Sequence, residues 1–134
     1  MRRSKRLTVY GEPKPQKRPR SFVRGGRSIV WSPRSPWRKA IADLAALQRP
    51  KPPFAGGVSV TLRFYMPRRS TTRKGDHWHV KRPDLDNLEK AVLDALGSAG
   101  WYADDGQVCH KSATKEYAPT GERPRVEIEV VEIA

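Results

Sequence analysis

Cysteine, acidic residues and long apolar runs are all scarce in this chain of 134 residues. The single cysteine, Cys109, cannot form a disulfide within the chain, which suits a reducing compartment, and we expect it to be a small buried residue. No apolar run has the length of a membrane span, and no basic start is followed by the apolar stretch of a signal peptide. These absences argue against a disulfide-stapled scaffold and a membrane partner, and they predict a cytoplasmic protein.

Negative charge is also scarce: 14 acidic residues face 27 lysines and arginines, for a net charge of +13. Nearly all of this excess lies in residues 1–39, where 13 basic residues accompany Glu12 alone. Such a balance points first to a polyanionic partner such as nucleic acid. The alternative is a basic protein with no nucleic acid target.

Hydrophobic periodicity predicts one small domain of α/β or α+β class, with a mixed β-sheet and two main helices. One helix is expected to start at Pro36 with Ser35 as its N-cap and to bury one face as far as Leu47. A second is expected over about 85–99, and Gly25-Gly26 is expected to form a hairpin turn. Strands are expected at 7–10, 21–24, 28–31, 58–66, 107–115 and 125–133.

Residues 67–83 form a long polar segment without periodicity, and a segment of this kind is usually functional or disordered. Its six basic residues surround Trp78, so it fits either a DNA-contacting loop or a mobile tether. His77 and His79 flank Trp78, and two histidines at this spacing can bind a transition metal. No third nitrogen or sulfur ligand for such a metal is near them in sequence. We expect them, and His110, to be structural.

Acidic residues gather around the second predicted helix. Asp84 and Asp86 stand at its start, and Asp104 and Asp105 follow it at the entrance to the next strand. A strand that returns along the helix could carry Asp105 towards the first pair. Each acid also has an ordinary reading: Asp86 as a helix cap, Asp94 as an ion-pair partner of Lys90, and the aspartate pair as a turn.

Taken together, the acids indicate a metal site. Clustered carboxylates repel one another, and a hard divalent cation such as Mg²⁺ removes that cost because it takes carboxylate and water oxygens as ligands. Such a cation polarises a phosphoryl oxygen and lowers the pKa of a bound water, which is what phosphodiester hydrolysis needs. A basic surface that holds the DNA backbone and an acidic patch that holds the cation would then belong to one nuclease.

Residues 82–108 resemble the RusA family of Holliday junction resolvases, which are endodeoxyribonucleases. The family pattern of D-x-D-N-x-x-K, D-A-L and D-D-x-Q-V appears here at 84–90, 94–96 and 104–108. The basic segment G-E-P-K-P-Q-K-R-P-R at 11–20 is similar to the early segment of many members. The resemblance implies one RusA-like endodeoxyribonuclease domain over residues 1–134.

The resemblance further implies a bacterial or phage-encoded homodimer that uses Mg²⁺ or Mn²⁺ and nicks two opposing strands of a four-way DNA junction. A metal-bound water would attack phosphorus in line and leave 5′-phosphate and 3′-hydroxyl ends. The family's metal-binding catalytic acids match Asp84, Asp86 and Asp105, and its required lysine matches Lys90, which could instead be a solvent-facing helix residue. We expect DNA contacts from Lys14, Lys17, Arg18, Arg20, Lys81 and Arg82.

Two rival functions stay open: a catalytically idle DNA-binding or architectural protein of this fold, and a nuclease with broader branched or flap substrates. The intact acids and Lys90 argue against the first. Which aspartate of the 104–105 pair is the ligand also stays open. The family pattern favours Asp105, and neighbouring side chains on a strand point to opposite faces, so both are not expected to reach one metal.

Overall fold

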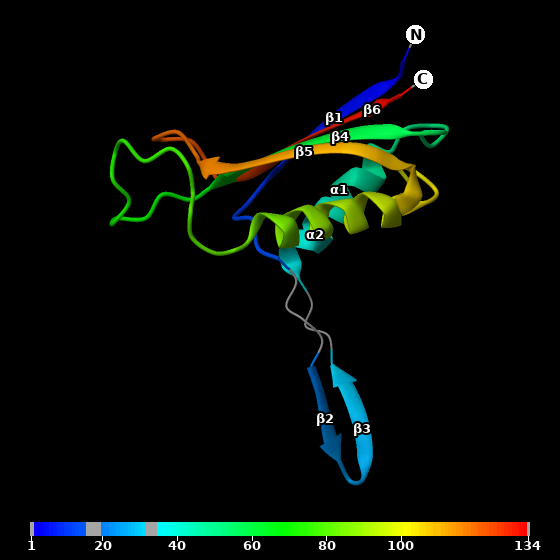
Figure 1. Cartoon of the computed structure of the whole chain (residues 1–134), viewed down its shortest axis with the longest axis horizontal. Helices are drawn as coiled ribbons and strands as arrows, with labels where there is room; N and C mark the ends of the chain where they lie inside the picture. Colours follow the sequence, from blue (N-terminus) through cyan, green and yellow to red (C-terminus); the bar gives the residue numbers. More distant parts are fainter. Residues whose placement is uncertain (1, 16–19, 32–34, 134) are drawn as a thin grey trace.

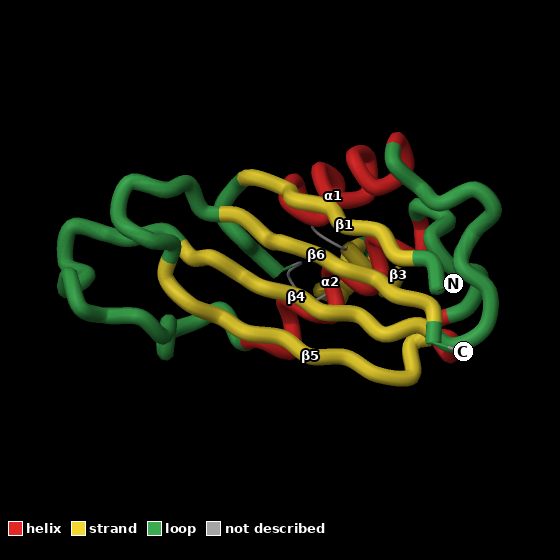
Figure 2. Tube along the Cα trace, turned by 90° about the horizontal axis from the view of Figure 1, so that it is seen from above, coloured by secondary structure: helices red, strands yellow, loops and turns green. Residues whose placement is uncertain are grey.

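The clearest alternation in the sequence forms the central strand β4 (Val58–Met66), whose apolar side chains at every second position are buried. The structure is a computed structural model and describes residues 2–15, 20–31 and 35–133. β6 (Arg125–Glu132) pairs antiparallel with one edge of β4, and β5 (Val108–Tyr117) pairs parallel with the other. β1 (Ser4–Tyr10) joins beside β6, so the sheet has the order β1-β6-β4-β5 (Figure 2).

Two helices, α1 (Pro36–Leu47) and α2 (Leu85–Ser98), lie against the same face of this sheet (Figure 1). The start of α1 is confirmed: the Ser35 side chain accepts a hydrogen bond from the Arg38 amide at 3.2 Å, and Pro36 is the first helical residue. Leu47 was expected to be buried and is 83% exposed. Ala45 takes the inward position in that last turn instead.

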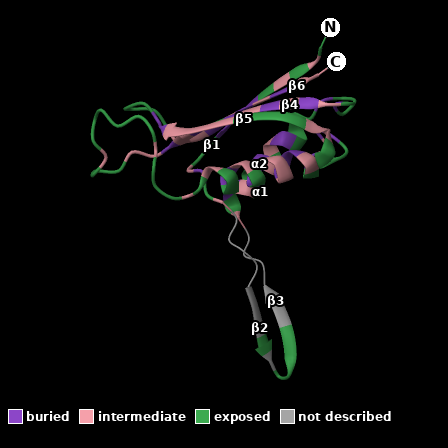
Figure 3. Ribbon diagram, viewed as in Figure 1, coloured by how far each residue is buried: buried purple, intermediate pink, exposed green. Residues whose placement is uncertain are grey.

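The core lies between the helices and the inner face of the sheet. One row of paired residues crosses this face, from Leu7 on β1 through Ile128 on β6 and Leu62 on β4 to Ala113 on β5. Three of these side chains are buried and Ala113 packs against the same cluster (Figure 3). The opposite face of the sheet carries mostly polar residues, as is common when one face of a sheet is solvated.

Trp101, just after α2, joins the two helices. Its side chain is fully buried, its indole N–H donates to the Ala45 carbonyl of α1 at 2.8 Å, and its ring meets Phe54 edge to face. A buried indole that finds such a partner carries no unsatisfied donor. This contact fixes the end of α2, and therefore the start of the turn that follows it.

The predicted hairpin is present as β2 (Arg20–Arg24) and β3 (Arg27–Trp31), which form a separate two-stranded sheet. Gly25 and Gly26 have φ of 58° and 75°, the left-handed values that a tight hairpin turn requires at both central positions. The hairpin stands away from the sheet and helices (Figure 1).

The predicted class, a small α+β domain with a mixed sheet and two helices, is confirmed. β5 begins at Val108 rather than 107 because residues Asp105–Gln107 form a short 3-10 turn, η1. Cys109 is exposed rather than buried, since it stands at the start of an edge strand. No helix in the described ranges has the length and apolar character needed to cross a membrane.

Candidate functional site

The acids lie along a β4-α2-β5 crossover whose geometry is set by strand direction. Because β4 and β5 are parallel, α2 must run back between them in the opposite direction. The start of α2 therefore lies beside the end of β5, and the end of α2 beside the start of β5 (Figure 1). The returning strand thus brings two lysines, rather than Asp105, to the first half of the helix.

Three observations show this pairing of helix and strand. At the start of α2, Lys115 Nζ near the end of β5 donates to the carbonyl of Pro83, directly before Asp84, at 2.6 Å. In the middle, Lys111 Nζ lies 3.9 Å from Glu89 Oε1. At the end, a methyl group placed on Gly97 would lie 3.5 Å from Asp105 Oδ1. Neither Lys111 nor Lys115 was predicted as a site residue, because their inward position follows from the pairing of β5 with β4.

Asp86, Lys90 and Asp94 lie four residues apart, on one face of α2. With Asp105 and Lys111 from beyond the helix, they line a depression of about 330 Å³ whose other lining residues are Leu93, Tyr102 and Val108. A water occupies about 30 Å³ in the liquid, so a phosphate group and several waters fit. Asp86, Lys90 and Asp105 of the predicted site therefore line one depression, with Asp105 at the end near Gly97.

Asp84 is placed differently. It is the N-cap residue of α2, but its side chain accepts no capping hydrogen bond, and it does not line the depression. The reading of Asp86 as the cap is wrong, because Asp86 lies in the first turn. Asp84 therefore stands at the exposed start of the helix, on the side of Lys115.

The 104–105 pair separates into two roles. The Asp104 carboxylate caps η1 by accepting from the Gly106 amide at 2.8 Å. Asp105 is exposed in the depression, and within the described residues its carboxylate accepts no hydrogen bond. Both lie in a turn, so the alternation of a strand does not choose between them. The turn uses the Asp104 carboxylate, whereas the Asp105 carboxylate is left exposed.

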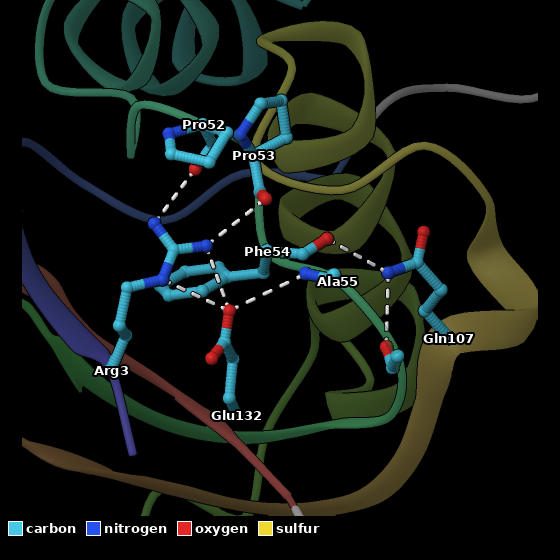
Figure 4. A network of polar contacts seen from close by, with 8 residues as sticks. Arg3, Pro52, Pro53, Phe54, Ala55, Gln107 and Glu132 are labelled. Carbon is cyan, nitrogen blue, oxygen red and sulfur yellow. Dashed lines mark hydrogen bonds and ion pairs between the residues drawn. The ribbon is translucent and has the colours of Figure 1, made fainter. Parts of the chain in front are cut away.

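Gln107 holds this turn in place. Its Oε1 accepts from the amides of Ala103 at 2.8 Å and Asp104 at 3.1 Å, and its Nε2 donates to the carbonyls of Phe54 and Gly56, both at 3.0 Å. All four polar positions of the side chain are used. The turn that carries Asp105 is thereby fastened to the loop before β4 (Figure 4).

The same loop is held from its other side by Arg3, which directly precedes β1. The guanidinium donates to the carbonyls of Pro52 and Pro53 at 2.8 and 3.0 Å, and it pairs with Glu132 of β6 at 2.7 Å (Figure 4). The ends of β1 and β6 therefore support the loop on which Gln107 rests. Sequence reasoning assigned no role to Arg3 or Gln107, although Gln107 is part of the family pattern.

Positive charges stand among the acids of the site. Lys90 and Lys111 line the depression, and Arg38 lines an adjoining one with Asp104 and Asp105. No ion pair joins Lys90 to Asp86 or Asp94 in the described part of the chain, so the proposed pairing of Lys90 with Asp94 is absent. The interleaved cations offset part of the repulsion among the acids.

Tyr102 is a buried residue that lines the depression beside Asp105 and Asp94. Burial, with the charges of Asp105 and Asp94, raises the pKa of its hydroxyl far above the usual value. The hydroxyl therefore stays protonated and donates to the Leu93 carbonyl at 2.7 Å. Tyr102 is a structural donor under the acids.

The donor set suits a hard cation by its chemistry, because it consists of carboxylates. As the side chains lie, no three acids, histidines or cysteines in the described residues are grouped closely enough to hold a metal by themselves. Mg²⁺ does not require such a group, since it is usually bound by one or two carboxylates, waters and substrate phosphates. Asp86 and Asp105 line the same depression, and Asp84 lies outside it.

The three histidines contact residues of the sheet. His77 Nε2 lies 3.1 Å from Glu116 Oε2, and the His79 ring meets Tyr117 edge to face with centroids 5.0 Å apart. His110 Nδ1 lies 3.0 Å from the Ser59 hydroxyl. Each contact ties a histidine to β4 or β5.

The 67–83 segment is fastened to the sheet. The guanidinium of Arg68 donates to the carbonyls of Ala118, Arg73 and Asp76 at 2.8 to 3.2 Å. Trp78 pairs with Glu116 through a backbone bridge, yet its side chain is 59% exposed. The segment thus extends the sheet and presents an aromatic ring to solvent.

Four of the six residues predicted to bind DNA lie within the described part of the chain. Lys14, Lys81 and Arg82 are exposed, and the last two directly precede Pro83 and Asp84. Arg20 begins β2. Lys17 and Arg18 lie outside the described residues.

The chain resembles known proteins over nearly its whole length. The family described as Endodeoxyribonuclease RusA matches residues 10–131. The uncharacterized protein YqaN of Bacillus subtilis is 33% identical over 141 residues, 96% of each chain. The crossover junction endodeoxyribonuclease rusA of Lactococcus phage r1t is 33% identical over 88 residues, 63% of each chain. Crossover junction endodeoxyribonuclease RusA of Escherichia coli K12 is 34% identical over 76 residues, 57% of this chain and 52% of that one.

Gln107 provides the first testable prediction. Gln107→Ala removes four hydrogen bonds at the turn, so we expect the free energy of unfolding in urea to fall by about 1–3 kcal/mol. Gln48→Ala is the control, because that exposed side chain follows α1 and should change stability by less than about 0.5 kcal/mol. Equal stability of the two variants would contradict the role of Gln107.

Proposed function

This chain belongs to the RusA family of endodeoxyribonucleases, and from that premise we propose that it is a metal-dependent endonuclease that resolves four-way DNA junctions by paired nicks. The observation that carries the proposal is the depression between α2 and β5. Asp86 and Asp105 enter it from two separate elements, together with the cations Lys90 and Lys111. The crossover junction endodeoxyribonucleases of phage r1t and E. coli support the choice of substrate.

The residues divide the chemistry between them. Asp86 and Asp105, with Asp84 from the residue before α2, would hold Mg²⁺ or Mn²⁺ against the DNA backbone. When bound, such an ion polarises the phosphoryl oxygen and makes water a better nucleophile. Lys90 and Lys111 place ammonium groups beside the same depression, where they neutralise charge that develops on the phosphate.

Exposed cations outside the depression bind the rest of the DNA. Lys81 and Arg82 lie next to Asp84, and Lys14 follows β1. Lys17, Arg18 and Arg20 belong to the same basic stretch of sequence as Lys14. Contacts of this kind fix the register of the DNA without reading its sequence.

The function is tested by incubating the purified chain with a synthetic four-way junction in Mg²⁺, beside linear duplex and flap substrates of the same sequence. We expect opposed nicks in the junction that DNA ligase can seal, because the ends should be 5′-phosphate and 3′-hydroxyl. Equal cleavage of the flap would indicate a broader nuclease. Binding of the junction without any cleavage would indicate an architectural protein.

The acids should differ in this assay. Asp84→Asn, Asp86→Asn and Asp105→Asn should each lower nicking by about 10²-fold or more while junction binding is kept or tightened, since a negative charge near phosphate is removed. Asp104→Asn should lose less than about tenfold, because asparagine caps a helix as well as aspartate does. An inactive Asp104→Asn beside an active Asp105→Asn would overturn the assignment. Circular dichroism checks that the variants are folded.

Junction binding should weaken steeply with salt, because phosphate contacts release counterions. Replacing Lys14, Lys17, Arg18 and Arg20 by alanine should lower the slope of log K against log salt by about one for each lost phosphate contact. The slope is measured by fluorescence anisotropy without divalent metal. An unchanged slope would exclude these residues from the DNA interface.

Two symmetric nicks are most simply made by a two-fold dimer. Sedimentation equilibrium at micromolar concentration should therefore give roughly twice the chain mass of 15.2 kDa. A monomer that still makes paired nicks would contradict the dimer.

A further inference from the structure

The side chain of Lys115 makes two hydrogen bonds to the main chain that have no part in the proposed function. Its ammonium donates to the carbonyl of Lys81 at 2.5 Å and to the carbonyl of Pro83 at 2.6 Å. These two carbonyls lie on either side of Arg82, and the second belongs to the residue directly before Asp84. One side chain of β5 therefore holds the main chain between the exposed DNA-binding cations and the first acid of the site.

The position of Lys115 on the sheet explains its reach. It pairs in register with Phe64, which is fully buried, so it belongs to the inner face of the edge strand. A lysine there can cover apolar surface with its methylene stem while the ammonium extends to the rim. Burial lowers the pKa of Lys115 and the charge of Asp84 opposes that shift, which agrees with an ammonium packed beside Asp84.

The main chain of Lys115 supports the same segment. Its carbonyl accepts from the His79 amide at 3.3 Å, and the Tyr117 amide donates to the His77 carbonyl at 2.8 Å. These backbone bonds hold residues 77–79, whereas residues 81–83 are held differently. Within the described residues, the only side-chain hydrogen bonds to the main chain of 81–83 come from the Lys115 ammonium.

We propose that Lys115 is a positioning residue of the nuclease site: its ammonium clamps the main chain before Asp84 and holds Lys81, Arg82 and Asp84 as one unit against β5. The effect on nicking rests on the proposed function, but the clamp itself does not. Two of the three ammonium donors are used by carbonyls. Lys115 therefore acts through Asp84 and is not assigned a contact with the reacting atoms.

The clamp has a chemical consequence for Asp84. A carboxylate at the free start of a helix can swing with the main chain that precedes it, and a swinging ligand binds a cation weakly. Residues that orient a metal ligand typically change metal affinity or activity by about 10- to 100-fold when they are removed. Lys115 should therefore affect the Mg²⁺ concentration that nicking requires more than the maximal rate.

The test compares Lys115→Met, which removes the donors and the charge, with Lys115→Arg, which keeps both. Lys51→Met is the matched control, because it removes the same charge from an exposed position in the loop between α1 and β4. Backbone ¹⁵N relaxation is measured first, without metal or DNA. The order parameters of the Arg82 and Asp84 amides should fall in Lys115→Met from near 0.85 towards about 0.6 and recover in Lys115→Arg.

The His79 amide provides an internal reference in the same spectra, since its acceptor is the backbone carbonyl of residue 115 and survives the substitution. Its order parameter should stay constant in all variants. A fall at His79 equal to that at Asp84 would mean that the whole segment has detached, and it would overturn a local clamp. Unchanged order at Arg82 and Asp84 would overturn it as well.

Nicking of the four-way junction is then followed as a function of Mg²⁺. Lys115→Met should raise the Mg²⁺ concentration for half-maximal rate by about 10- to 100-fold, with most of the rate restored at saturation, and Lys115→Arg should restore both. Loss of order without a shift in the Mg²⁺ requirement would overturn the positioning role. If the wild-type chain nicks no substrate, the proposed function fails, and the relaxation experiment still decides the clamp.

Discussion

The parallel pairing of β4 with β5 is the constraint on which the candidate site depends. Because the two strands run in one direction, α2 must return between them in the other, so the start of α2 lies beside the end of β5 and its end beside the start of β5. Lys115 contacts the main chain directly before Asp84, Lys111 lies near Glu89, and the turn of Asp105 lies beside Gly97. The loop before β4, held by Arg3 and Gln107, fixes the far end of this arrangement (Figure 4).

The acids that gather in the sequence of this basic protein are farther apart in the structure, and lysines lie among them. Two of the acids lie on α2 itself, where the eight residues from Asp86 to Asp94 correspond to about 12 Å along the helix axis. Lysines from the edge strand stand beside them, so the surface alternates in sign. In the proposed nuclease, a phosphodiester would bring negative charge to the lysines and a divalent cation would bring positive charge to the carboxylates, so DNA and metal would each favour binding of the other.

Much of this could be predicted from the chain alone. The alternation in 58–66 predicts both ends of β4 correctly. Ser35 and Pro36 predict the start of α1, and Gly25-Gly26 predicts the hairpin turn. The family pattern leads directly to the acids. The distances between the acids could not be predicted, because nothing in the sequence of β5 itself shows that it pairs with β4. Lys111 and Lys115 were overlooked for that reason: on a strand of unknown neighbours, an inward lysine is indistinguishable from an outward one.

The alternation of β5 also makes its length as important as its composition. One residue inserted after Cys109 would turn Lys111 and Lys115 to the polar face of the sheet and point Ser112 and Thr114 at the helix instead. Two inserted residues would restore the faces but slide both lysines about 7 Å along α2, away from Glu89 and Asp84. A substitution elsewhere in this stretch can therefore leave both lysines facing the helix, whereas an insertion or deletion moves them, and a matching change in α2 would not return them to the inner face.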